Sequence, residues 1–253
     1  MRGAIFAFIL SLQLVHCRET LEDAAKNVRS LLATQSIGTL ASVYPDLGPS
    51  SSYAEPLSGY APPQNLAGHA FALPEYYAPC FPNNGSLLLI MFRISQNAKN
   101  ILAKPNPSVH STDDNIQTPL EWSEGDEDNL LTTWKTSGQA TFIVQELPLS
   151  PSPVTKPRVS LMGNLTLLSD DWMHVRGTHS GDPSENQDGD DSDELAECYL
   201  SYHPDSKWWI PGRGAFHDVA WARFDPEAVY YVGGFGGTHY IGYIPLDLYQ
   251  KSG

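Results

Sequence analysis

The side chains that most often perform catalysis or bind metals are scattered along this sequence. After residue 17, no two histidines have the H-E-x-x-H spacing of a zinc-binding helix. The sequence has no G-x-S-x-G motif, which would carry a nucleophilic serine, and no glycine-rich phosphate loop. We therefore predict no catalytic residue and no metal site. The histidines considered are His69, His110, His174, His179, His203, His217 and His239.

One acidic stretch, residues 170–193, leads into a pattern that resembles a calcium site. Six side chains fall at the ligand offsets of an EF-hand loop, but Asp191 stands where that loop requires glycine, and no helix is expected before it. A solvated charge run is the default interpretation, and we expect much of the stretch to be disordered. The six residues are Asn186, Asp188, Asp190, Ser192, Glu194 and Glu197.

The cysteines must be read together with the start of the chain. Residues 1–17 resemble a secretory signal peptide, because Arg2 supplies a positive charge, residues 4–15 are apolar, and a cleavage site precedes residue 18. Removing the signal removes Cys17 and leaves Cys80 and Cys198 in a domain of residues 18–253. In an oxidising compartment two cysteines favour one disulfide; the alternative is two unrelated buried thiols.

Two glycosylation motifs support the same compartment. Asn84-Gly85-Ser86 and Asn164-Leu165-Thr166 are acceptors for N-linked glycans. The first apolar run is too short to cross a bilayer, and no later stretch is long enough, so we predict no membrane span. We expect a chain that is secreted or delivered to the lumen of a lysosome or vacuole, and the signal alone does not separate these destinations.

The charge balance excludes one class of partner. The chain has 15 basic and 29 acidic residues, which gives a net charge of −14. A polyphosphate would be repelled by this charge, so we predict no nucleic-acid partner.

The periodicity predicts a β-rich single domain with few helices. Thr20–Thr34 has a helical apolar stripe, with Thr20 and Asp23 as a variant capping box. Two shorter helices are expected at 95–104 and 194–202, while 75–84 looks irregular. Strands are expected at 36–43, 70–73, 86–94, 137–146 and 158–168, and long loops at 44–66, 107–137 and 170–193.

The C-terminal stretch predicts a hairpin. Strands at 219–224 and 228–232 flank a turn at Asp225-Pro226, where proline fixes φ and the aspartate can hydrogen-bond its own backbone. The glycines at 233, 234, 236 and 237 allow positive φ or a close backbone approach. We expect Trp208 and Trp209 to pack the preceding helix against the barrel, and His203 to hydrogen-bond the end of that helix.

Three separated segments together resemble the CREG group of the split β-barrels related to pyridoxamine 5′-phosphate oxidase. The first is AAKNVRSLLATQSIGTLAS, and the second is SLLLIMFRISQNAKNILAKPNPSV. The third runs from GNLTLLSD through ECYLSYHPDSKWW to ARFDPEAVYYVGGFG. The resemblance implies a mainly β (α+β) fold, a six-stranded antiparallel split β-barrel with flanking helices that is usually a homodimer.

The resemblance also raises the question of a flavin. The oxidase relatives bind the phosphate of FMN with several basic side chains, whereas the matching strand and helix here offer Arg93, Lys99 and Lys104. A position that is often histidine in flavin-binding relatives is Asn97. CREG proteins are generally regarded as lacking functional flavin binding, so we expect no cofactor, with FMN as the alternative.

Three further residues match positions of functional interest in relatives. Ser95 and Asn100 map onto the family's helix motif, where we expect them to cap the helix or satisfy backbone groups. His239 follows the glycine cluster, and haem-degrading relatives use a histidine near their C-terminus; a satisfied surface or core histidine is the preferred interpretation.

The resemblance and the residues together predict a CREG-like, N-glycosylated barrel that acts by binding a protein or glycan partner, without catalysis. The alternative is an FMN-dependent oxidoreductase. We expect a homodimer whose interface uses apolar residues of 87–92, Trp208, Trp209 and 229–232, unless the loops at 44–66 and 107–137 cover them instead.

Overall fold

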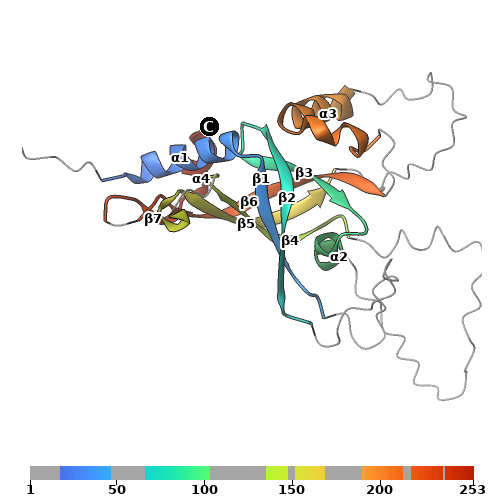
Figure 1. Cartoon of the computed structure of the whole chain (residues 1–253), viewed down its shortest axis with the longest axis horizontal. Helices are drawn as coiled ribbons and strands as arrows, with labels where there is room; N and C mark the ends of the chain where they lie inside the picture. The colour runs from blue at the N-terminus through green and yellow to red at the C-terminus, as the bar shows by residue number, and fades with distance from the viewer. Residues whose placement is uncertain are drawn as a thin grey trace, which may run out of the picture.

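Six antiparallel strands close into a barrel, as the sequence predicts (Figure 1). The computed structural model describes residues 18–46, 66–102, 135–147, 152–168, 190–212, 218–235 and 237–253. The strands are β1 (Ile37–Val43), β2 (Ala70–Phe81), β3 (Ser86–Phe92), β4 (Ser137–Gln145), β5 (Arg158–Leu167), β6 (Val219–Val232) and β7 (Ile241–Ile244). The helices are α1 (Leu21–Thr34), α2 (Gln96–Leu102), α3 (Asp190–Tyr202) and α4 (Leu246–Lys251), with short 3-10 turns at Pro153–Thr155 and Pro204–Trp208.

The barrel closes through one long strand. The strands follow the order β3-β2-β1-β4-β5-β6-β7, and an additional pairing of β3 with β6 completes the ring. The first half of β6 lies between β5 and β3, whereas its second half lies between β5 and β7. β7 therefore extends the sheet beyond the closed ring.

The predicted C-terminal hairpin is wrong, because β6 is continuous over 14 residues. It pairs with β5 over residues 222–232. The register shifts between the pairs Met162–Ala228 and Gly163–Pro226, which leaves Glu227 as the extra residue. A Cβ built on Gly163 would lie 2.0 Å from the carbonyl oxygen of Asp225, so glycine lets the two backbones approach there. Pro226 thus stands directly before the bulged residue Glu227 in a continuous strand, a position where proline is tolerated.

The expected irregular segment at 75–84 is also mostly strand. β2 runs from Ala70 to Phe81 despite its two prolines, because its first half pairs with β1 and its second half with β3. The chain then turns through residues 82–85, where Gly85 has φ of 73°. The prolines at 74 and 79 interrupt the sequence pattern without ending the strand.

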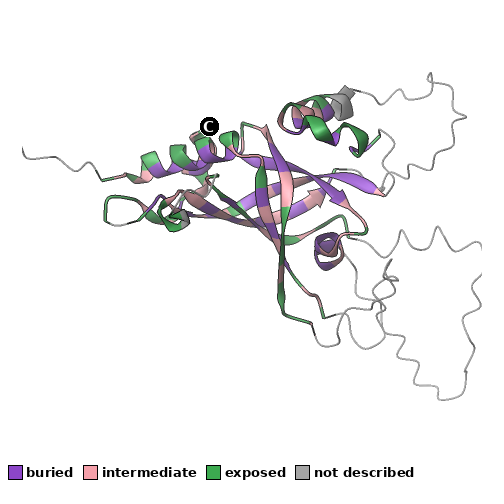
Figure 2. Cartoon of the chain, in the orientation of Figure 1, coloured by how far each residue is buried: buried purple, intermediate pink, exposed green. Residues whose placement is uncertain are grey.

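Helices α1 and α2 cover opposite ends of the barrel (Figure 1). The Thr20 side chain and Asp23 form the predicted capping box at the start of α1. The buried face of α1 meets the main core, which fills the barrel with alternate residues of the strands (Figure 2). At the other end, α2 packs against β1 and β4.

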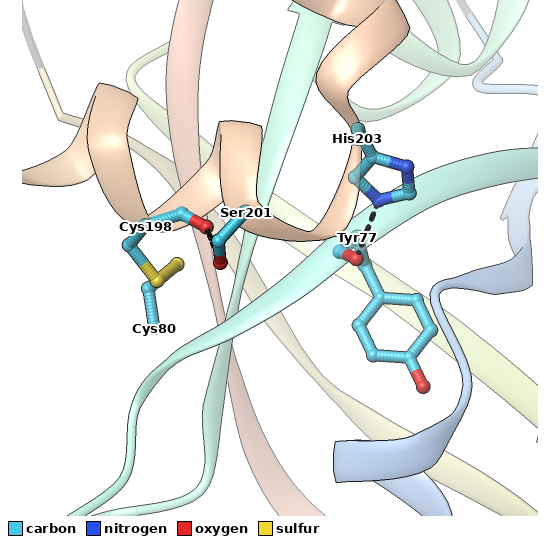
Figure 3. The surroundings of a disulfide bond; sticks show 5 residues. All are labelled: Tyr77, Cys80, Cys198, Ser201 and His203. Carbon is cyan, nitrogen blue, oxygen red and sulfur yellow. Dashed lines mark hydrogen bonds between the residues drawn. A yellow bond between two sulfur atoms is a disulfide. The ribbon is translucent and has the colours of Figure 1, made fainter.

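Helix α3 covers the outer face of β2, β3 and β6. Ala196 and Tyr199 pack there against Leu88, Ile90 and Trp221, which form a second apolar cluster outside the barrel. Cys80 of β2 and Cys198 of α3 are joined by a disulfide (Figure 3). The expected packing role of Trp208 is wrong, because its side chain is 67% exposed; the smaller Ala196 and Tyr199 fill that role.

Several predictions fall outside the described residues. These are the signal at 1–17, Lys104, most of the predicted loops at 44–66, 107–137 and 170–193, and the first residues of the calcium-like register. Within the described part of the chain, no group of three or more His, Cys, Asp or Glu side chains is placed to hold a metal ion. No described helix is long and apolar enough to cross a membrane.

Candidate functional site: an aromatic pocket

A pocket of about 350 Å³ lies beside β2 and β3, helix α3 and the turn that follows α3. We call it the aromatic pocket. Most of its walls are apolar or aromatic, and one residue carries a carboxylate, a composition typical of small-molecule binding sites. Its described lining residues are Pro74, Glu75, Tyr76, Ile90, Phe92, Tyr199 and Trp209.

The elements around the pocket are fixed by links between α3 and β2. The disulfide connects Cys198 with Cys80, and the neighbouring residue Tyr199 is fully buried beneath α3. The His203 Nε2 atom lies 2.9 Å from the carbonyl oxygen of Tyr77 (Figure 3). These two links keep Tyr199 and Tyr76 beside the same pocket.

His203 is a structural residue behind one wall of the pocket. Its ring stacks on Tyr76 with centroids 4.2 Å apart and an interplanar angle of 10°. A carbonyl oxygen only accepts hydrogen bonds, so Nε2 carries the proton that is donated to Tyr77. Burial lowers the pKa of His203 below its ordinary value, which favours the neutral ring. The prediction that this side chain bonds its own helix is wrong, because the ring reaches β2 instead.

Glu75 supplies the charge of the pocket. Burial raises the pKa of its carboxyl group, and a hydrogen bond from Asn97 opposes this shift. The Asn97 Nδ2 atom lies 3.4 Å from Glu75 Oε1 and 3.3 Å from the carbonyl oxygen of Leu40. Glu75 has no ion pair within the described part of the chain.

The residues that match the family's helix motif serve the fold. Asn97 and Asn100 are buried, and each is hydrogen-bonded to the buried side chain of Ser42. Ser42 Oγ donates to Asn97 Oδ1 at 2.8 Å and accepts from Asn100 Nδ2 at 3.0 Å. Ser95 Oγ accepts a hydrogen bond from the backbone N–H of Ala98, which caps the start of α2. The amide groups are thereby occupied with the barrel itself.

The basic residues considered for a flavin phosphate do not form a cluster at the pocket. Arg93 pairs with Asp218 at 3.1 Å, and Lys99 lies on α2. No described lining residue of the aromatic pocket is basic. A phosphate group would therefore meet Glu75 without a compensating positive charge, so the described residues of this pocket do not fit FMN.

A second hollow of about 490 Å³, the polar cleft, lies beside α1 and the C-terminal glycine cluster. Glu19 occupies it and accepts hydrogen bonds from the Asn27 side chain at 2.7 Å and the Tyr240 backbone N–H at 2.7 Å. His239 Nδ1 lies 3.6 Å from Glu19, so the histidine considered for haem contacts this carboxylate. A Cβ on Gly233 would lie 2.2 Å from Glu19 Oε2, which explains glycine there.

The predicted glycosylation sites lie on separate elements. Asn84 is in the turn between β2 and β3, where its Oδ1 accepts a hydrogen bond from the backbone N–H of Ser86. Asn164 lies in β5, and its Nδ2 donates to Glu227 at 2.5 Å. Both side chains belong to half-buried residues.

The sequence did not indicate the pocket itself, because Glu75 and Tyr76 lie in the segment expected to be irregular. The two cysteines were the feature of the sequence from which the pocket could have been predicted. Tyr76 lies four positions before Cys80, and Tyr199 directly follows Cys198, so a bond between the cysteines brings the two tyrosines to one place.

Comparison with solved structures gives similar chains of low identity. A heme-binding protein from Mycobacterium smegmatis is 15% identical with a TM-score of 0.49, and the match covers 90% of this chain and 60% of that one. A protein of unknown function from Agrobacterium tumefaciens is 15% identical with a TM-score of 0.43, covering 84% of this chain and 57% of that one. A pyridoxamine 5′-phosphate oxidase-related, FMN-binding protein from Nostoc punctiforme is 12% identical with a TM-score of 0.35, covering 83% and 80%.

The sequence itself identifies the family. The chain spans less than two thirds of the first two structures above. No curated protein matches its sequence significantly. The family profile described as "CREG, beta-barrel" matches residues 19–251, which is nearly the whole chain after the predicted signal. Together with the closed six-stranded barrel, this match shows that the chain belongs to the CREG β-barrel family.

Proposed function

We propose that this chain is a secreted or vacuolar glycoprotein of the CREG family that acts by binding, without catalysis. The observation that carries the proposal is the aromatic pocket, which combines apolar walls with a single carboxylate. The polar side chains nearest to it, Asn97 and His203, are occupied with the barrel. Binding in such a pocket gains from removing apolar surface from water, while the carboxylate selects the charge of the ligand.

The alternative function, an FMN-dependent oxidoreductase, is tested by adding FMN to the purified chain. We expect no saturable quenching of flavin fluorescence and no bound absorbance near about 450 nm after gel filtration. Riboflavin serves as the control, since it lacks the phosphate. Saturable binding of FMN that is weakened by Arg93→Ala would overturn the proposal and support the oxidoreductase.

The secretory part of the proposal rests on the signal at 1–17, the two sequons and the disulfide. Expression in eukaryotic cells should give a product that begins near residue 18 and loses two glycans on endoglycosidase treatment. Asn84→Gln and Asn164→Gln should each remove one glycan. A chain that keeps its first residues and does not change mass would contradict the assignment.

A further inference from the structure

We infer that the aromatic pocket binds an alkylated ammonium group, with Glu75 as the counter-charge and the rings of Tyr76, Tyr199 and Trp209 as walls. This inference rests on the proposed function, because it names the ligand class of the same pocket. The inference names only the group that is bound. An alkylated ammonium occurs both in free small molecules and in the side chain of methylated lysine.

The walls provide the surface that such a cation needs. Tyr76, Phe92, Tyr199 and Trp209 contribute four aromatic rings to one hollow. An alkylated ammonium is weakly hydrated and is attracted to the negative face of an aromatic ring, more strongly when both are removed from water. Trp209 is 38% exposed, so its ring forms the part of the wall that a ligand approaches from solvent.

Glu75 provides the charge. It is a half-buried carboxylate, and the hydrogen bond that it accepts from Asn97 is long at 3.4 Å. A carboxylate removed from water without a cationic partner is costly, and a bound ammonium group would supply that partner. The raised pKa of Glu75 has the same origin in burial, and a cation beside it would lower this pKa again.

The surroundings favour a cation over an anion or a metal. Behind Tyr76, burial keeps His203 neutral, so this ring adds no positive charge to the wall. Asp205 accepts a hydrogen bond from Tyr76 Oη at 3.1 Å and adds a second negative group near the pocket. The chain as a whole carries a net charge of −14. A metal ion needs several ligating groups, and Glu75 is the only described carboxylate that lines the pocket.

The size of the pocket limits the ligand. Its volume of about 350 Å³ lies at the lower end of the roughly 300–1,000 Å³ that small-molecule sites span. A trimethylammonium headgroup with a short chain would fill it, whereas a flavin ring with its ribityl phosphate is far larger.

The test is a titration of the full mature chain with choline, followed by calorimetry and by tryptophan fluorescence. The matched ligand is dimethylbutanol, the uncharged carbon isostere of choline. We expect saturable binding of choline and none of the isostere. Equal binding of both ligands, or binding of neither, would overturn the inference.

Variants locate the site. Glu75→Gln keeps the shape of the side chain and should weaken choline binding by at least about tenfold, because the counter-charge is lost. Trp209→Ala should weaken binding as well. Because Trp209 is exposed, we expect the variant to fold, and thermal unfolding checks this. Asp247→Asn is the control, since this exposed carboxylate lies on α4 and does not line the pocket. Unchanged affinity in Glu75→Gln would contradict the inference.

A peptide that contains trimethyl-lysine separates the two sources of the group. Tighter binding of the peptide than of choline identifies a protein partner, and the reverse identifies a free small molecule; either result supports the ammonium site. The FMN titration is independent of this test. Saturable FMN binding defeats the proposed function, whereas loss of choline binding alone defeats only this inference.

Discussion

Ser42, Asn97 and Asn100 form a buried hydrogen-bonded group that connects α2 to β1. Replacing Asn97 with alanine would remove the acceptor of the buried Ser42 hydroxyl proton and one donor to the Leu40 carbonyl, while Ser42 would still accept from Asn100. We expect Asn97→Ala to lower the free energy of unfolding by about 2 kcal/mol, since buried polar groups without a partner cost roughly 1–3 kcal/mol each. Chemical denaturation measures this change.

The matched control for this prediction lies on the same helix. Lys99→Ala removes a basic side chain that the sequence marks as a candidate phosphate contact, yet it is half-exposed. Its effect on stability should stay within about 0.5 kcal/mol. Equal stability of both variants would show that the buried group contributes nothing to the fold.

His203 links stability to pH. Its pKa is lower in the folded protein than the ordinary histidine value of 6.5, because burial disfavours the charged ring. The unfolded chain therefore binds a proton more readily, so this contribution to stability is complete above that value and falls as the pH drops below it. We expect the melting temperature to fall between neutral pH and about pH 5, and to fall less in His203→Gln. His69→Gln, at an exposed position, should behave like the unchanged chain.

At the level of elements, the bulge in β6 depends on a single glycine in the neighbouring strand. Gly163 has no room for a side chain, because a Cβ would lie 2.0 Å from the backbone oxygen of Asp225. Gly163→Ala should cost about 1–3 kcal/mol, the range for overpacked sites, or more if β5 and β6 separate. Thermal unfolding measures the loss. Gly237→Ala is the control, since nothing lies within 4 Å of its added Cβ.

The elements show where sequence reasoning succeeds and where it fails. The α1 boundary is well predicted because Thr20 and Asp23 signal it locally. The continuity of β6 is not predicted, because Asp225-Pro226 has the composition of a turn. The strand stays extended there through its pairing with Gly163 of β5. Likewise, the path of β2 through its prolines depends on pairing with β1 and β3. The pocket was missed for the same reason, since its walls come from segments over 100 positions apart.

At the scale of the whole molecule, only part of the surface predicted for the homodimer is exposed: Trp208 and Trp209 are exposed, whereas the predicted strand residues are mostly buried. Leu87–Met91 is buried within a single chain, by the barrel core on one face and by α3 on the other. Further exposed apolar side chains occur at the two ends of β1, in β2 opposite the middle of β1, and on β4 beside β1. They are Ile37, Val43, Leu73 and Ile143.

We predict that a second copy covers these side chains. The charge of −14 opposes association only weakly at physiological salt, where the Debye length is about 8 Å. Light scattering of the mature, deglycosylated chain should give twice the mass of one chain, and Ile143→Glu should shift it towards a monomer. Tyr243→Glu, at an exposed site on β7, is the control. A single-chain mass in the unchanged protein would contradict the dimer.

The disulfide also determines which products a protease would give from this molecule. Cys80 and Cys198 are 118 positions apart, so the bond closes a covalent ring that includes β3, α2, β4 and β5. One cut anywhere inside that ring would give a two-chain protein whose parts separate only on reduction. Tyr76 would then belong to one chain and Tyr199 to the other, and the aromatic pocket would be shared between them. One proteolytic cut between residues 80 and 198 would thus give a disulfide-linked heterodimer of the two fragments. It would run as two bands on a reducing gel and as one band without reductant.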